Sequence, residues 1–202
     1  MNVREGLVRA AGWPFRKIRR EIRLHRLARV RARGCVPAAE PAAPVPPCLI
    51  ISPGGVGTTF LIDHCARFTS LNHRNDRDGL KHLPRFAGTE EFTRSRIIFV
   101  TGKPEDVFAS LRRRGWLRDQ AAKLGLPRAL WLTGRARKAA FIAGVEAQAE
   151  SFRAAAETGQ VLMIDYEQIW DRKAEIARWF GIADPAFLAD FPERRGRTGQ
   201  SV

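Results

Sequence analysis

Residues 49–62 read LIISPGGVGTTFLI, and this stretch decides the fold of the chain. Its apolar run is typical of a buried strand, and its glycines allow a turn tight enough to bring backbone N–H groups together. Such donors ahead of a helix form a cradle for an anion. An ATP-binding loop would carry a lysine before its hydroxyl residue, but here Thr58 follows Gly57 directly. The loop therefore predicts a phosphate site unlike the common ATP or GTP site.

Strands and helices alternate after this loop. Apolar runs predict strands at 48–52, 79–82, 96–101 and 160–165, and helical patterns lie at 57–70, 104–114, 128–157 and 167–180. This alternation predicts an α/β fold, a three-layer parallel sheet with helices on both faces. Ligands of such sheets bind at the carboxyl ends of the strands, which is where the glycine loop stands.

The positive charge of the chain is concentrated near its start. The 202 residues have a net charge of +14, and residues 1–34 hold eleven basic residues against two acidic ones. Apolar residues between positions 15 and 33 recur every three or four residues, which predicts a basic amphipathic helix. Two interpretations stay open. The helix adsorbs to an anionic membrane surface, with nucleic acid the weaker candidate, or it packs on its own domain as a solvated helix.

Residues 35–47 are rich in proline and alanine and predict a linker, because proline cannot continue a helix. The globular domain is then expected at 48–202. The three cysteines lack the spacing of a disulfide framework or a zinc site, which favours a reducing compartment. No apolar run reaches the length of a membrane-spanning helix. We expect a cytoplasmic protein, or one peripheral to a membrane, and the oligomeric state stays open.

Four segments of the domain resemble motifs of one enzyme family. Residues 53–60 (PGGVGTTF) are similar to P-K-S-G-T-T-W, and residues 81–84 (KHLP) to K-T-H-L-P. Residues 96–110 (RIIFVTGKPEDVFAS) are similar to K-I-I-Y-V-x-R-N-P-x-D-V-x-x-S, and residues 194–199 (RRGRTG) to R-K-G-x-x-G. These are motifs of the sulfotransferases that use 3′-phosphoadenosine 5′-phosphosulfate (PAPS). Over residues 48–199 the chain resembles a divergent, bacterial-type member of that family.

The resemblance implies a P-loop-like sulfotransferase fold and an activity. The sulfuryl group of PAPS would pass to a hydroxyl or amine of a carbohydrate or small metabolite, and no metal would take part. His82 would accept the acceptor's proton, a role that suits an imidazole at neutral pH. The residues that the resemblance assigns to PAPS binding are Gly55, Gly57, Thr58, Thr59, Phe60, Ser110, Arg194, Arg195 and Gly196.

Two positions depart from the family's pattern. Gly55 stands where the family has a lysine, and Gly102 stands where it has an arginine for the 3′-phosphate. The loss of one charge-assisted contact costs about 1.5–3 kcal/mol. Lys81, Arg85 and Lys103 are the candidates for a replacement charge. Two alternatives therefore stay open: a non-catalytic relative that binds a phosphorylated ligand or a protein partner, and a nucleotide-dependent kinase.

Overall fold

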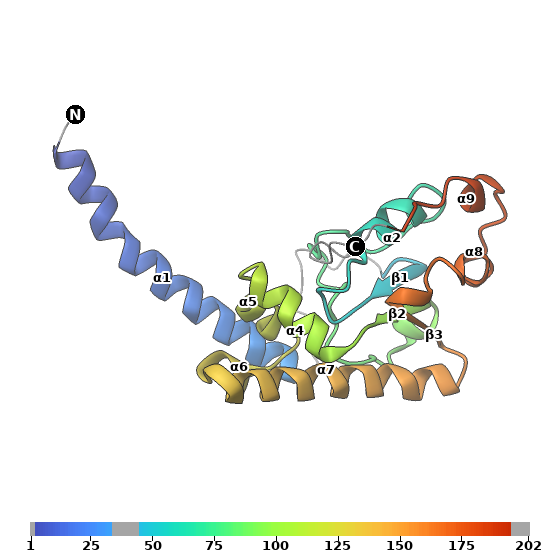
Figure 1. The fold of residues 1–202 in the computed structure, drawn as a ribbon. Coiled ribbons are helices and arrows are strands. Elements are labelled where there is room, and N and C mark those ends of the chain that lie inside the picture. The colour runs from blue at the N-terminus through green and yellow to red at the C-terminus, as the bar shows by residue number, and fades with distance from the viewer. Residues whose placement is uncertain (1–2, 34–44, 195–202) are drawn as a thin grey trace, which may run out of the picture.

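The computed structural model describes residues 3–33 and 45–194. They form an α/β fold in which helices flank a sheet of three parallel strands, and one long helix reaches away from this body (Figure 1). The strands are β1 (Cys48–Ile51), β2 (Arg96–Thr101) and β3 (Val161–Asp165), and they lie in the order β1-β2-β3. The predicted class, α/β with a parallel sheet, is confirmed.

The register of the sheet brings the carboxyl ends of the strands to one edge. Ile51 pairs with Phe99, and Phe99 pairs with Met163, so neighbouring strands run side by side without a large offset. Every residue of β1 is buried, which is expected of a parallel strand that is covered on both faces. The loop after β1 therefore leaves the sheet at the edge where such folds bind ligands.

Side chains alternate between two apolar clusters, one on each face of the sheet. The even-numbered residues of β1 and β2 pack with α2 (Thr59–Cys65) and α8 (Lys173–Phe180). The odd-numbered residues pack with the second half of α7 (Gly134–Glu157). On that face Phe152 stacks on Phe99, with the ring centroids 4.4 Å apart. Helices thus cover both faces of the sheet.

Several helices differ from the predicted ranges. The helix predicted at 128–157 is interrupted by the extended backbone at Leu132 and Thr133, and helix α5 (Leu117–Lys123) was not predicted at all. The segment predicted at 167–180 begins with a short 3-10 turn before α8. The remaining elements are α3 (Glu90–Thr93), α4 (Pro104–Arg113), α5 (Leu117–Lys123), α6 (Pro127–Trp131), η1 (Tyr166–Gln168) and α9 (Ala186–Ala189).

The strand predicted at 79–82 is wrong, because this segment consists of turns and coil. Gly79 has a φ of 73°, which a strand does not adopt. The carboxylates of Asp76 and Asp78 accept hydrogen bonds from the backbone N–H groups of Lys81 and Leu80, at 3.0 and 3.1 Å. These local bonds compete with strand pairing and hold the chain in a loop.

The long helix α1 (Val3–Ala32) begins well before the predicted start at residue 15. Its second half packs on α5 and α6, where Leu24 and Ala28 are buried, and its first half extends from the body (Figure 1). None of the helices in the described ranges is long and apolar enough to cross a membrane. Of the predicted linker, only residues 45–47 belong to the part of the chain that the structure describes.

Candidate anion-binding site

The loop between β1 and α2 turns at three glycines. Gly54, Gly55 and Gly57 have φ values of 83°, 74° and 75°, the left-handed region in which glycine alone is free of strain. A Cβ added to Gly55 would lie 3.2 Å from Cγ of Leu111 on α4 and 3.2 Å from the carbonyl oxygen of Val107. A lysine at position 55, as in the family's motif, would therefore strain the backbone and crowd Leu111 and Val107 of α4.

Helix α5 lies against the same loop. A Cβ on Gly54 would lie 2.7 Å from Cδ of Gln120, whose side chain is buried. The Nε2 group of Gln120 has no hydrogen-bond partner within residues 3–33 and 45–194. A buried amide without a partner typically costs about 1–3 kcal/mol, so this donor beside the glycine loop is well placed for a ligand oxygen.

The two threonines of the loop have different partners. Thr58 is buried, and its Oγ1 lies 3.1 Å from Oγ of Ser52 at the end of β1. Thr59 is the first residue of α2 and is half-buried. Gly57 is exposed, and a Cβ there would lie 3.2 Å from the ring of Tyr166. The hydroxyl of Thr59, rather than that of Thr58, accepts a hydrogen bond from the ammonium group of Lys81.

Lys81 brings a positive charge to the glycine loop. Its Nζ donates hydrogen bonds to Oγ1 of Thr59 at 2.9 Å and to the carbonyl oxygen of Arg74 at 2.8 Å. The side chain is buried, and no carboxylate in the described ranges lies within ion-pair distance of it. Burial lowers the pKa of Lys81, while the charge of Asp76 raises it in part. Within the described ranges, this buried ammonium group therefore has no direct carboxylate partner, and Asp76 and Asp63 act on it from beyond ion-pair distance.

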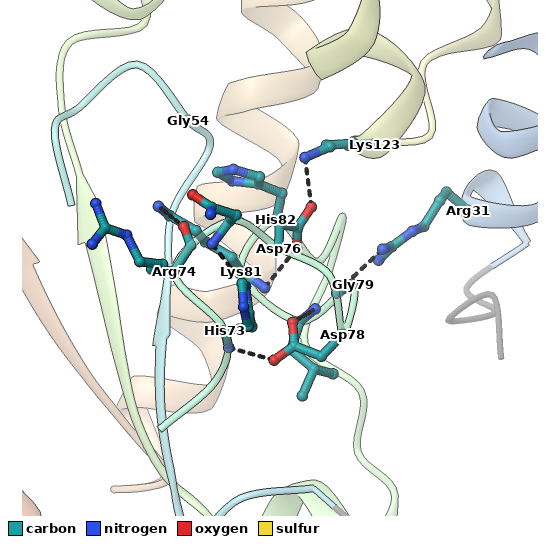
Figure 2. Close-up of polar contacts among 12 residues, drawn as sticks. Arg31, Gly54, His73, Arg74, Asp76, Asp78, Gly79, Lys81, His82 and Lys123 are labelled. Carbon is teal, nitrogen blue, oxygen red and sulfur yellow. Dashed lines mark hydrogen bonds and ion pairs between the residues drawn. The ribbon is translucent and has the colours of Figure 1, made fainter. Parts of the chain in front are cut away.

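Asp76 holds the segment that carries Lys81 (Figure 2). It is a non-glycine residue with a positive φ, 57°, a conformation that aspartate tolerates better than most residues. One oxygen accepts the backbone N–H of Lys81, and the other forms a 2.8 Å ion pair with Lys123 of α5. The carboxylate is almost completely buried. Asp76 therefore links the segment to α5.

Helix α1 contacts the same segment through Arg31. The guanidinium donates a hydrogen bond to the carbonyl oxygen of Gly79 at 2.7 Å, as Figure 2 shows. Arg31 is buried, and burial lowers its pKa, with Asp76 and Asp78 acting in the opposite direction. The last turn of α1 thus helps to hold the backbone two residues before Lys81.

The geometry of His82 fixes which ring nitrogen carries the proton. Nδ1 lies 2.9 Å from the carbonyl oxygen of Ser52, and a carbonyl can only accept, so Nδ1 is the protonated nitrogen. Nε2 then keeps its lone pair, and within the described ranges it has no hydrogen-bond partner. Burial lowers the pKa of His82 to about 4, with Asp76 and the Ser52 bond opposing the shift. The imidazole is therefore neutral at physiological pH.

Arg194 lies on the same side of the molecule as the start of α2. Its guanidinium sits 5.5 Å from the ring centroid of Trp170, and it pairs with the carboxylate of Glu167. Trp170 in turn stacks on Phe60, with the centroids 5.3 Å apart. Phe60 and Arg194 are thus joined through one indole. The other two predicted residues of this motif, Arg195 and Gly196, lie outside the described residues.

The segment after β2 lies close to the loop as well. Ser110 is half-buried on α4, next to the residue that packs on Gly55, and its hydroxyl has no bond partner in the described chain. A Cβ on Gly102 would lie 2.8 Å from Cγ1 of Val56, so an arginine cannot be placed there without moving Val56. Arg85 and Lys103 are exposed, which leaves Lys81 as the replacement charge that reaches the loop.

Sequence reasoning missed several residues that shape this site. Asn72, Asp76, Gln120 and Lys123 belong to none of the four motifs. The one available signal was the cluster of Asp76, Asp78 and Gly79, which is typical of a turn. The side chains of Gln120 and Lys123 come from a helix that was not predicted, so their contacts with the loop could not be expected.

The comparisons with known proteins identify no relative of this chain. No model of a protein family matches it, and the searches of curated proteins and of solved structures found no match. The functional inference therefore depends on the residues and geometry of the glycine loop.

Proposed function

We propose that the domain binds PAPS at the glycine loop and transfers its sulfuryl group to a hydroxyl or amine acceptor. The observation that carries the proposal is the buried ammonium of Lys81 on Thr59, which has no direct carboxylate partner among residues 3–33 and 45–194. A buried charge is costly unless an opposite charge accompanies it. A loop of backbone donors at the carboxyl edge of a parallel sheet is where a phosphate group would supply that charge.

Lys81 would take the role of the family's loop lysine, because Gly55 occupies the position of that lysine in this chain. As the bond between sulfur and the bridging oxygen breaks, negative charge grows on the departing phosphate. A fixed cation at that point stabilises the transition state, and removal of one such contact commonly lowers the rate about 10²–10³-fold. Gln120 Nε2 and the hydroxyls of Thr58 and Thr59 are further donors for the same group. Phe60, Ser110 and Arg194 are assigned to the nucleotide by the resemblance alone.

His82 would act as the base in this reaction. The acceptor oxygen or nitrogen attacks sulfur, its proton passes to Nε2 of His82, and the electron pair of the broken bond stays on the phosphate of adenosine 3′,5′-bisphosphate. The bond from Nδ1 to Ser52 keeps the imidazole in the tautomer that can accept this proton. A pKa of about 4 makes His82 a weak base in the ligand-free protein, and the negative charge of bound PAPS would raise it toward the working pH.

A second candidate function is binding without transfer. It is favoured by the depth of His82, which is only 8% exposed, and by the absence of an arginine at Gly102. In that case the glycine loop and Lys81 hold a phosphorylated ligand, and the same fold presents it to a partner. Both candidates require the anion site, and only the first requires His82 to meet an acceptor.

Isothermal titration calorimetry tests the anion site that both candidates share. Adenosine 3′,5′-bisphosphate and PAPS are titrated into the whole chain, into Lys81→Met and into Lys103→Met, an exposed lysine that serves as the matched control. We expect binding to the unmodified chain and the control. For Lys81→Met, affinity falls about 10–100-fold, as expected for one charge-assisted contact. Absence of binding to the unmodified chain, or equal affinity in all three, contradicts the proposal. Tight binding of ATP with Mg²⁺ alone would favour a kinase.

A further inference from the structure

A groove of about 930 Å³ runs between α1 and the junction of α6 and α7. Its wall includes three large apolar side chains, Ile18, Ile22 and Trp131, which are 54%, 63% and 71% exposed. Large side chains of this kind are buried in most of the domain. Exposed apolar side chains gathered in one place mark a binding surface more often than isolated ones do.

The exposed isoleucines of the groove lie on a different side of α1 from the residues that are buried against the domain. Ile18 and Ile22 are four residues apart and share one helix face, whereas Leu24 and Ala28 face the domain and are buried. The first half of α1 reaches beyond the body of the domain in Figure 1.

The charges around the groove are positive. Arg26, Arg29 and Arg33 line it and are exposed, and none of them has a carboxylate partner in the described part of the chain. The one acidic residue in the lining, Glu21, is already paired with Arg118 of α5. The surface therefore combines exposed apolar groups with arginines that remain available for anions.

We propose that this face of α1, together with Trp131, is a docking surface for a lipid bilayer that contains anionic phospholipids. The apolar side chains would enter the boundary between headgroups and acyl chains, and the arginines would contact lipid phosphates. A tryptophan at the edge of an apolar surface is typical of such a boundary. The ring of His25 stacks on Trp131 at 4.2 Å and holds the indole in place.

The apolar residues distinguish a bilayer from RNA as the occupant. RNA binding needs arginines and flat rings that stack on bases, and branched aliphatic side chains such as Ile18 and Ile22 add little to it. A bilayer uses both kinds of residue, because its headgroups are charged and its interior is apolar. Loss of the two isoleucines should therefore weaken docking to vesicles and leave any contact with RNA nearly unchanged.

Vesicle sedimentation of the full chain tests the proposal. We expect retention on phosphatidylcholine vesicles that contain phosphatidylserine, little retention on phosphatidylcholine alone, and release as the salt concentration rises. The double variant Ile18→Asn/Ile22→Asn should bind at least about tenfold more weakly, because it removes the apolar part of the contact. Arg26→Glu/Arg29→Glu should also lose at least about tenfold. Leu188→Asn, at an exposed leucine of α9, is the matched control and should bind normally.

Quenching of tryptophan fluorescence by brominated lipids gives a second measurement that does not need the helix variants. We expect quenching with anionic vesicles, and a smaller effect in Trp131→Phe. Equal retention on both kinds of vesicle, unchanged binding of folded Ile18→Asn/Ile22→Asn, or unchanged quenching in Trp131→Phe would overturn the proposal. Retention on RNA without retention on vesicles would overturn it too. These outcomes are independent of nucleotide binding at the glycine loop.

Discussion

Lys81 and His82 are neighbours in the sequence, and their side chains enter the site with different chemistry. Lys81 places an ammonium on Thr59, whereas His82 bonds to the backbone of Ser52 and keeps a free lone pair. Both are buried, and burial lowers the pKa of each. In the proposed function, Lys81 offers charge to an anion and His82 offers a neutral acceptor for a proton. This difference allows the two roles to be tested separately.

Lys81→Met should not destabilise the ligand-free protein. The variant removes a buried charge that has no carboxylate within ion-pair distance in the described ranges, and it keeps most of the side-chain volume. The lost hydrogen bonds are therefore offset by a smaller desolvation cost. We expect a free energy of unfolding within about 1 kcal/mol of the unmodified chain, or above it. Urea denaturation measures this value. A loss of more than about 3 kcal/mol would mean that Lys81 is a structural residue rather than a group awaiting an anion.

His82→Gln should separate transfer from binding. A glutamine amide can still donate to Ser52, but it cannot accept a proton from the acceptor. Transfer of radioactive sulfate from PAPS to a mixture of hydroxyl and amine acceptors should fall about 10²–10⁴-fold. Affinity for adenosine 3′,5′-bisphosphate should stay within a few-fold. Equal transfer by both proteins would remove His82 from the reaction and favour the non-catalytic candidate.

The low pKa of His82 also predicts how stability depends on pH. Its pKa is about 4 in the folded protein against 6.5 in an unfolded chain, so the unfolded state binds more protons between these values. Stability should therefore fall as the pH is lowered from about 6.5 to about 4, by roughly 3 kcal/mol in total. The pKa of His64 is lowered by burial as well and adds a loss of the same sign.

Urea denaturation at several pH values checks this dependence. His82→Gln should reduce the slope between about pH 6.5 and 4 without abolishing it, because His64 remains. Gln168→Asn, at an exposed side chain that does not titrate, is the control and should keep the slope of the unmodified chain. If His82→Gln leaves the slope unchanged, His82 is not held neutral in the folded state.

At the scale of the elements, the segment from Leu71 to His82 takes the place that a fourth strand was predicted to fill. It borders β1 through side chains and single backbone contacts. The amide of Asn72 accepts the N–H of Ile50 at 2.8 Å and donates to its carbonyl at 3.0 Å, as the backbone of a neighbouring strand would. Beyond it, the carbonyl of Lys81 accepts the N–H of Ser52 at 3.0 Å. The edge of β1 is thus covered without a further strand.

Asn72→Ala tests this role directly. It leaves the buried N–H and C=O of Ile50 without partners, and each such group costs about 1–3 kcal/mol. We expect a loss of about 2–5 kcal/mol in the free energy of unfolding, which is large for a single substitution. Asn75→Ala, at an exposed asparagine of the same segment, should change it by less than about 0.5 kcal/mol. Thermal and urea denaturation measure both, and equal effects would contradict the role given to Asn72.

Across the whole molecule, the sequence predicted those features of the fold that depend on residues close to one another in the chain. The apolar runs at β1, β2 and β3 and the turn at Gly54, Gly55 and Gly57 depend on short-range preferences, and they appear where expected. The predicted strand at 79–82 did not form, because carboxylates within the same segment bind its backbone.

Contacts between distant parts of the chain could not be predicted. Arg31 and Gly79 are 48 residues apart, and Lys123 meets Asp76 from a helix that the sequence did not indicate. No spacing rule connects such pairs, because the path of the chain brings them together. The choice of Lys81 over Arg85 and Lys103 depends on the same long-range geometry. The motif residues could therefore be identified from the sequence. That Lys81 is the residue whose charge reaches the glycine loop could be seen only in the folded structure.

A crystal structure of the whole chain with adenosine 3′,5′-bisphosphate tests the central claim most directly. We predict that the 5′-phosphate occupies the glycine loop, with an oxygen about 2.7–3.2 Å from Nζ of Lys81 and the 3′-phosphate on the side of Ser110 and Arg194. A nucleotide bound elsewhere, or a glycine loop that stays empty at saturating nucleotide while Lys81 keeps its bonds to Thr59 and Arg74, would contradict the claim.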